Sequence, residues 1–370
     1  MKSVQKQAPW GLARISQRQT INFGIPNKYL YADRAGEGVD VYVLDTGINT
    51  EHVDFEDRAT WGKTICRGDE DKDGNGHGTH CSGAIAGKKY GVAKMAKVIG
   101  VKVLRDNNFG SFEDVARGIA WATRSHLKNV KDKKRGFKGS VINMSFGSKK
   151  SHALDRAIHR AVKAGIHICV AAGNENADAC DYSPANSKLV VTVGATTADD
   201  SLAYFSNYGK CIDIFAPGVN IQSTWIGSKR AVKTISGTSM ASAHVAGLMA
   251  YFLSLQPELG SDFAVSSMTP SKMKELLFSV ATKDAISDLP EETANLLAYN
   301  GGGSSDFPSF SDSSIYPISV TDETSFKSDP NPSPMALSWK DVIEKNVQAI
   351  VKKVGKDIKT LVVSADLTST

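Results

Sequence analysis

The sequence has few cysteines and no long apolar run. Its 370 residues include five cysteines, and no two of them form a CxxC pair, which disfavours a cysteine-ligated metal site. Glycine or a charged residue interrupts every apolar stretch, so no transmembrane helix is expected. Residues 1–6 lack the apolar segment of a signal peptide, and we therefore expect either a cytosolic protein or a processed fragment.

Positive charge exceeds negative charge only slightly. The 44 Lys and Arg residues against 39 Asp and Glu residues leave a net charge of +5. With 41% hydrophobic and 22% charged residues, the composition is typical of a soluble globular protein. The densest basic cluster, residues 128–138, has no aromatic residue between Lys128 and Arg135. It is predicted to be a solvated loop between a helix and a strand, and no nucleic-acid partner is expected.

Alternating extended and helical segments predict an α/β fold. The predicted buried strands cover residues 39–45, 98–104, 166–170 and 139–147, the last of which runs into a loop. Ser111 has the spacing of a helix cap, and apolar periodicity predicts a helix over 151–164. Such alternation over residues 39–256 indicates crossover connections and a mainly parallel central sheet.

Polar residues follow three of the predicted strands. Asp45 ends the first, Ser145 follows the strand that begins at Gly139, and Asn174 follows the strand over 166–170. In parallel sheets the functional site lies beyond the carboxyl ends of the strands. We therefore expect these three side chains at one edge of the sheet.

Ser239 is the candidate nucleophile. It follows the turn-forming Gly237 and precedes apolar residues at helical spacing, so it is predicted to lie at a helix N-terminus. Free backbone N–H groups and the helix dipole favour developing negative charge at that position. A serine hydroxyl also needs a histidine base and a carboxylate that orients the base.

Two upstream motifs supply the base and the carboxylate. Asp45 ends a buried β-branched run, and His77 stands in the motif Gly-His-Gly-Thr-His just before a stretch of small residues. The His77 and His80 pair is not an HExxH motif, which counts against zinc. The order acid, histidine, serine differs from that of chymotrypsin and of the α/β-hydrolases, and this also disfavours an esterase.

Together the three motifs resemble the subtilisin-like serine proteases. Residues 8–15, Cys81 after the histidine motif, residues 207–209 and residues 296–300 are similar to the proteinase K branch, nearest to fungal vacuolar cerevisin-type enzymes. The resemblance covers residues 8–300. It implies a three-layer α/β fold with a mainly parallel sheet for a peptidase domain of residues 1–300.

The resemblance also implies the roles of single residues. Ser239 would attack the peptide carbonyl, His77 would carry the proton and Asp45 would orient the imidazole. Asn174 matches the side-chain donor to the oxyanion. Substrate would bind as an added strand between two edge segments, with broad specificity and a roomy pocket for an apolar or aromatic P1 residue. The residues matched to this cleft are Gly110, Ser111, Ser145, Phe146, Gly147, Ala171, Ala172 and Gly173.

The family pattern further implies a disulfide and a metal site. Cys180 and Cys211 match positions that are bridged in some relatives, which implies an oxidising lumen, either a vacuole or another part of the secretory pathway, or secretion. The Asp213 carboxylate with the carbonyls of Lys188 and Val190 would hold a structural calcium ion. No cofactor is expected for the chemistry. The expected partners are polypeptide substrates and a prodomain or protein inhibitor, and the chain is expected to be a monomer.

One departure from the family pattern concerns catalysis. Ala243 stands where the family usually has proline, four residues after the nucleophile. Alanine restores an N–H that can bond the Ser239 carbonyl, which predicts altered acylation or acyl transfer. It also leaves open a weakened or silent subtilase that acts as a binding or regulatory protein.

The composition changes after Asn300. Residues 301–334 are rich in Gly, Ser, Asp and Pro, which predicts a linker without a core of its own. In residues 335–370, apolar residues recur at helical spacing with lysines between them. An amphipathic helix is predicted there, which either docks on the domain or binds a membrane surface or partner.

Overall fold

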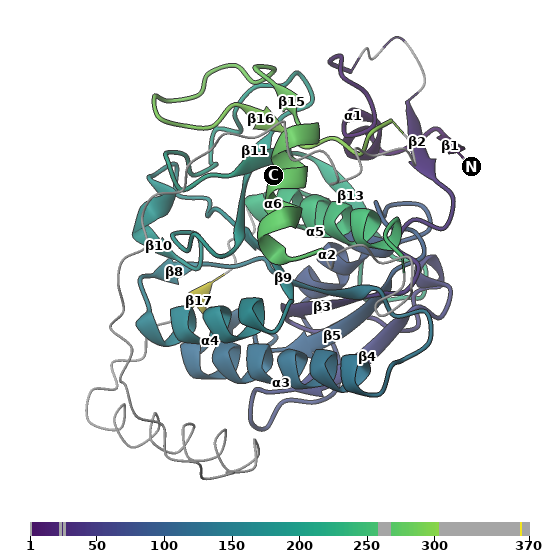
Figure 1. The fold of residues 1–370 in the computed structure, drawn as a ribbon, viewed down its shortest axis with the longest axis vertical. Coiled ribbons are helices and arrows are strands. Elements are labelled where there is room, and N and C mark those ends of the chain that lie inside the picture. Colours follow the sequence, from purple (N-terminus) through teal and green to yellow (C-terminus); the bar gives the residue numbers. More distant parts are fainter. Residues whose placement is uncertain (1, 22–23, 25–26, 258–267, 303–362, 365–370) are drawn as a thin grey trace. The chain divides into compact units, whose positions relative to one another are not determined.

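A nine-stranded sheet organises the chain in the computed structural model (Figure 1), which describes residues 2–21, 24, 27–257, 268–302 and 363–364. In spatial order the strands are β15 (Thr282–Lys283), β16 (Leu296–Leu297), β12 (Ile214–Pro217), β11 (Val191–Thr196), β9 (His167–Ala171), β7 (Gly139–Met144), β3 (Val39–Asp45), β5 (Lys97–Lys102) and β4 (Ala59–Thr64). All neighbouring pairs are parallel except β15 with β16. The predicted mainly parallel sheet is confirmed.

Four helices cover the two faces of this sheet. They are α2 (His77–Ala86), α3 (Phe112–Lys131), α4 (His152–Lys163) and α5 (Thr238–Ser254). Apolar residues of α3 and α4 form one buried cluster with alternate residues of β3, β7 and β9. The helix α5 lies on the other face of the sheet. Cys169 of β9 points to that face, and its thiol donates a hydrogen bond to the Ser242 carbonyl of α5. The fold is therefore the predicted three-layer arrangement, with α3 and α4 on the same side of the sheet in Figure 1.

Local signals in the sequence set the ends of α3 and α4. The Ser111 and Ser151 side chains each accept a hydrogen bond from a backbone N–H three residues later, as N-caps do. Gly165 follows α4 with a φ of +92°, a conformation that suits glycine at a helix end. Because α3 continues to Lys131, the basic cluster begins on this helix, and only its second part is the predicted loop.

The helix α5 is buried over its whole length. All 17 of its residues have low exposure, including Ser239, Ser242 and His244. An α-helix that is apolar on all sides is a central helix rather than a surface one. The N-terminus of α5 is therefore fixed by packing on every side.

Smaller elements surround the sheet. They are α1 (Trp10–Arg14), α6 (Pro270–Val280), the 3₁₀ turns η1 (Val53–Phe55) and η2 (Ala179–Asp181), and the antiparallel pairs β1 (Lys2–Lys6) with β2 (Lys28–Ala32), β8 (Ser148–Lys149) with β10 (Tyr182–Ser183), β13 (Ile221–Thr224) with β14 (Val232–Ile235), and β6 (Phe109–Gly110) with β17 (Val363–Ser364).

The predicted linker and C-terminal helix lie mostly outside the described residues. Of the predicted helical tail, only Val363–Ser364 is described, and it forms the strand β17 rather than a helix. In the part of the chain that the structure describes, no helix has the length and apolar character needed to cross a membrane.

Candidate active site

The three candidate catalytic residues come from three different elements. Asp45 is the last residue of β3, His77 is the first of α2, and Ser239 is the second of α5. Ser145 and Asn174 follow β7 and β9, which are parallel neighbours in the same sheet. The sheet therefore collects these polar groups at its carboxyl edge, as the sequence predicts.

Asp45 and His77 form a fully buried pair. The His77 Nδ1 atom lies 2.8 and 2.9 Å from the two carboxylate oxygens of Asp45, and both side chains are 0% exposed. The backbone N–H of Thr46 donates to Asp45 Oδ1 at 2.7 Å. A carboxylate buried to this degree is costly unless donors surround it, and the imidazole N–H is one of those donors.

Close backbone packing explains the glycine after His77. A Cβ atom on Gly78 would come 2.2 Å from the Gly47 carbonyl oxygen, so no larger residue fits without a shift. The Gly78 N–H also donates to Thr46 Oγ1 at 3.0 Å. The start of α2 is thereby held against the end of β3, which brings His77 to Asp45.

The carboxylate controls the protonation of His77. Burial by itself lowers the pKa of His77, but the Asp45 carboxylate and the nearby Cys81 thiol raise it well above the usual 6.5. The Cys81 Sγ atom lies 4.0 Å from His77 Nδ1. The neighbouring His80 behaves differently, because burial lowers its pKa to about 3 and its Nε2 is bonded to the Ile221 and Lys233 carbonyls.

Ser239 donates its hydroxyl to a backbone carbonyl. The Oγ atom lies 3.0 Å from the Ser145 carbonyl oxygen, and Ser145 Oγ donates in return to the Ser239 carbonyl at 3.2 Å. The buried Nε2 atom of His77 has no hydrogen-bond partner among the described residues. Attack by Ser239 therefore requires its hydroxyl to leave Ser145 and donate to His77, a contact that often forms only when substrate binds.

Asn174 is oriented by the start of α5. Its Oδ1 atom accepts hydrogen bonds from the backbone N–H of Thr238 at 2.8 Å and from the Thr238 hydroxyl at 2.9 Å. With the amide oxygen fixed in this way, the Nδ2 donor is left on the other side of the amide, 3.7 Å from where a Cβ atom of Gly237 would be. The arrangement suits a donor to an oxyanion beside Ser239.

Asn207 is a positioning residue whose role the sequence did not reveal. Its Oδ1 accepts from the N–H groups of Glu175 and Ala177, and its Nδ2 donates to the Ala172 carbonyl at 2.9 Å. These bonds hold the loop that carries Asn174. Asn207 belongs to the family-like stretch 207–209, but its contacts join residues about 30 positions apart, which no local pattern shows.

Several residues that the resemblance matches to the cleft are buried. Ser145 is 0% exposed and Phe146 3% exposed, so their side chains do not line an open cleft. Ala172, the residue after β9, packs in a buried core cluster with Phe215 and Leu297. A carboxylate lies beside Gly173, because Glu175 Oε2 would be 2.4 Å from a Cβ atom at that glycine.

The predicted edge strand for substrate already has a partner in the chain. Phe109–Gly110 forms β6, and Val363 and Ser364 of β17 pair with it in antiparallel register. Ser111, the next residue, caps α3. An extended peptide can add to β6 only where β17 leaves its backbone groups accessible.

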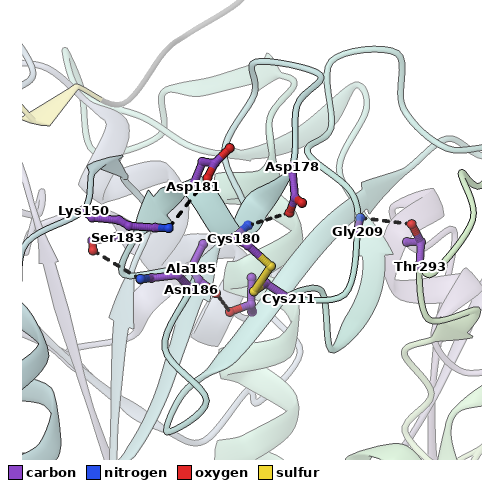
Figure 2. The surroundings of a disulfide bond; sticks show 11 residues. Lys150, Asp178, Cys180, Asp181, Ser183, Ala185, Asn186, Gly209, Cys211 and Thr293 are labelled. Carbon is purple, nitrogen blue, oxygen red and sulfur yellow. Dashed lines mark hydrogen bonds and ion pairs between the residues drawn. A yellow bond between two sulfur atoms is a disulfide. The ribbon is translucent and has the colours of Figure 1, made fainter.

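The predicted disulfide is present. Cys180 and Cys211 are bonded, and they close a loop with a sequence separation of 31 (Figure 2). Around the bond, Asp178 Oδ1 accepts from the Cys180 N–H, and the Gly209 N–H donates to Thr293. The bond thus links the segment after Asn174 to the segment after Asn207.

The residues proposed for calcium surround a lysine. The Nζ atom of Lys274 on α6 contacts the Asp213 carboxylate and the carbonyls of Lys188 and Val190. The three oxygens therefore converge as the resemblance implies, but a cation of the chain itself lies among them. Elsewhere in the described residues, the one group of three metal-ligating side chains found close together is Asp45, His77 and Cys81, which belongs to the catalytic candidates.

A comparison with known families matches the subtilase family over residues 36–301. The chain belongs to the subtilase family. It is 65% identical over 309 residues to the subtilisin-like serine protease Pen c 2 of Penicillium citrinum, which covers 82% of this chain and 68% of that protein. It is 64% identical over 309 residues to subtilisin-like protease 8 of Trichophyton verrucosum, where the shares are 82% and 63%.

A solved subtilase has the same fold. The crystal structure of a cold adapted subtilisin-like serine proteinase aligns with a TM-score of 0.69 and 41% identity, over 80% of this chain and 98% of that one. Among proteins with known names, alkaline protease 2 of Aspergillus fumigatus is 60% identical over 329 residues, which is 88% of this chain and 66% of that protein. The chain thus spans about two thirds of the length of these relatives.

Loss of the disulfide is predicted to destabilise the fold. In a Cys180→Ser/Cys211→Ser variant the unfolded chain regains the entropy of an open loop, and we expect the free energy of unfolding to fall by about 2–4 kcal/mol. Urea unfolding followed by tryptophan fluorescence measures this. The control is Lys150→Ala, which removes the nearby surface ion pair with Asp181 and should change stability by at most about 0.5 kcal/mol. Equal midpoints for the double variant and the parent would contradict the prediction.

Proposed function

We propose that the chain is a serine endopeptidase of the proteinase K type. The observation that carries this proposal is the buried Asp45–His77 hydrogen bond at the start of α2, which packs against the helix α5 whose N-terminus carries Ser239. The subtilase relatives support it, because several bear names of proteases. The alternative of a silent binding protein has no such support, and the sequence keeps an acid, a histidine, a serine and an asparagine at the positions that match the family.

The mechanism follows from the contacts of these side chains. Ser239 Oγ attacks the peptide carbonyl while His77 Nε2 takes the hydroxyl proton, and Asp45 stabilises the imidazolium that forms. The Asn174 Nδ2 and the Ser239 N–H donate to the oxyanion. His77 then protonates the leaving amine, and water hydrolyses the acyl-enzyme by the same steps.

Substrates are proposed to be extended polypeptides bound mainly through their backbones. Backbone pairing with Gly110 and Ser111 on one side and with residues 145–147 on the other ignores side-chain identity, which favours broad specificity. An apolar or aromatic P1 residue is expected, because the carboxylate of Glu175 already accepts a hydrogen bond from Asn207 Nδ2 at 2.7 Å.

The cellular setting is also a proposal. The Cys180–Cys211 bond favours an oxidising compartment, and we place the protein in a vacuole or another lumen of the secretory pathway, with secretion as the alternative. The cerevisin-like motifs support the vacuole. We further propose a monomer that meets a prodomain or a protein inhibitor at the same cleft as substrate.

Covalent labelling tests the proposed activity. A fluorophosphonate should react with the full chain at Ser239, whereas Ser239→Ala should not react. A Ser271→Ala variant, changed on the surface of α6, controls for labelling of other serines and should react like the parent. A folded chain that resists the reagent would refute the assignment.

P1 preference can be measured with tetrapeptide anilides that differ only at P1. We expect kcat/KM to be higher for Phe and Leu than for Lys, because the predicted pocket is apolar and the Glu175 carboxylate is occupied by Asn207. Because Asn207 occupies that carboxylate, Glu175→Gln should change the rates for Lys and for Phe only slightly. Strict preference for Lys or Arg would contradict the predicted pocket.

Asn174→Ala should remove one oxyanion donor. We expect kcat to fall by about 10²–10³-fold with KM nearly constant, a magnitude measured for the equivalent donor of subtilisin rather than derived from this chain. Steady-state kinetics on one peptide anilide checks it. Asn129→Ala, which removes the hydrogen bond from Asn129 on α3 to the Asp40 carboxylate, serves as the control. An unchanged kcat for Asn174→Ala would refute the role.

Activity should depend on pH through His77. The base must be neutral to accept a proton, and its pKa is raised in the folded state, so kcat/KM should fall as pH drops through that raised pKa and rise toward alkaline pH. The rate on an uncharged peptide ester, measured from acid to alkaline pH, gives the midpoint. A plateau already reached below the ordinary histidine pKa of about 6.5 would contradict this.

The pairing of β17 with β6 predicts competition with long substrates. A Val363→Pro/Ser364→Pro variant removes two backbone N–H groups from β17 and should weaken that pairing. We expect a lower KM for a peptide that reaches β6 and an unchanged KM for a single-residue ester that does not. An equal KM for the long peptide would show that β17 does not compete.

A further inference from the structure

Three oxygen atoms from separate segments converge on the ammonium of Lys274. The Nζ atom lies 2.8 Å from Asp213 Oδ2, 2.9 Å from the Val190 carbonyl oxygen and 3.3 Å from that of Lys188. Lys188 and Val190 lie in the loop before β11, Asp213 directly precedes β12, and Lys274 is on α6. One side chain thus joins a helix to the starts of two neighbouring strands.

These distances fit an ammonium and not a metal ion. A lysine ammonium has three N–H donors, and here three acceptors lie within about hydrogen-bonding distance of it. Calcium takes six to eight oxygen ligands at about 2.3–2.6 Å. A calcium ion in the same place would also be pressed against the positive charge of Lys274. The residues present therefore do not fit the calcium ion that the family resemblance implies.

We propose that Lys274 replaces a structural calcium ion at this site. The ammonium supplies the positive charge and satisfies the same carboxylate and carbonyl oxygens, so the chain carries its own cation where a metal would otherwise be recruited. It follows that the stability supplied by this site does not depend on the calcium concentration.

The burial of Asp213 explains why a cation is needed there. Its side chain is 18% exposed and that of Lys274 is 22% exposed. Burial raises the pKa of the Asp213 carboxyl, while Lys274 and the Thr192 N–H, which donates to Oδ2 at 2.9 Å, act to lower it. Removing one partner of such a pair leaves a poorly solvated charge, which is strongly unfavourable.

The position of this ion pair links it to the candidate active site. Asp213 is two residues after Cys211, and both Lys188 and Val190 lie within the loop closed by the Cys180–Cys211 bond. The same loop contains Asn207, which holds the segment that carries Asn174. A covalent bond and the Lys274 ammonium therefore restrain one segment together.

Thermal unfolding in the presence and absence of calcium tests the proposal. The full chain with Ser239→Ala is used as the parent, so that self-digestion cannot interfere and the readout is independent of catalysis. Its Tm should be the same in CaCl2 as in a calcium chelator. If calcium binds elsewhere in the chain, the parent and an added Asp213→Asn variant should show the same calcium-dependent shift in Tm. A Lys274→Ala substitution should lower the Tm by several degrees in chelator.

Calcium should then compensate for the lost lysine. In Lys274→Ala, CaCl2 but not MgCl2 should restore part of the Tm, and Asp213→Asn should abolish that rescue. Lys188→Ala is the matched control, because it removes an exposed positive charge next to the site but keeps the carbonyl, and it should gain no calcium response. Lys274→Gln serves as a second variant if Lys274→Ala does not fold.

Three results would overturn the proposal. The first is a calcium-dependent rise in the Tm of the parent that Asp213→Asn removes, because the site would then still take the metal. The second is an unchanged Tm for the Lys274 variants in chelator. The third is a loss of Tm that calcium does not rescue, because Lys274 would then form an ordinary ion pair rather than replace a metal.

Discussion

A carboxylate buried without contact to solvent is the constraint around which the site is built. Asp45 is 0% exposed, and its charge is compensated at the end of β3 by the Thr46 N–H and the imidazole of His77. To place that imidazole correctly, α2 must start against β3, which is why Gly78 has no room for a side chain. The position of His77 thus follows from the need to surround the buried Asp45 carboxylate with hydrogen-bond donors.

A second set of contacts fixes Asn174, the proposed oxyanion donor, independently of His77. The amide oxygen of Asn174 is bound by Thr238, and its loop is held by Asn207. Thr238 directly precedes Ser239, so the positions of Asn174 and Ser239 are both fixed relative to the N-terminus of α5. Any movement of the start of α5 would carry both of them together, which keeps their separation constant while the base stays on α2.

The sequence predicted those parts of the structure that depend on local pattern. The β-branched run at 39–45 is the strand β3 with the same bounds, and Ser111 caps α3 as its spacing indicates. The contacts of Lys274 could not be predicted for a physical reason, since the three oxygens around its ammonium belong to residues 61 to 86 positions away and nothing near Lys274 in the sequence marks its role. The core packing of Ala172 likewise has no local signal, because residue size does not reveal whether a residue at a strand end points into the core.

The nucleophile is held in place by more contacts than its helix alone provides. Ser239 and Ser145 exchange hydrogen bonds, hydroxyl to carbonyl in each direction, and Asn143 in turn donates to Ser145 Oγ at 2.8 Å. The regular pattern of α5 adds the N–H of Ala243 to the Ser239 carbonyl, a bond that proline at this position could not make. Because these bonds hold the Ser239 carbonyl, the Ser239 side chain can rotate away from Ser145 while its backbone N–H stays fixed.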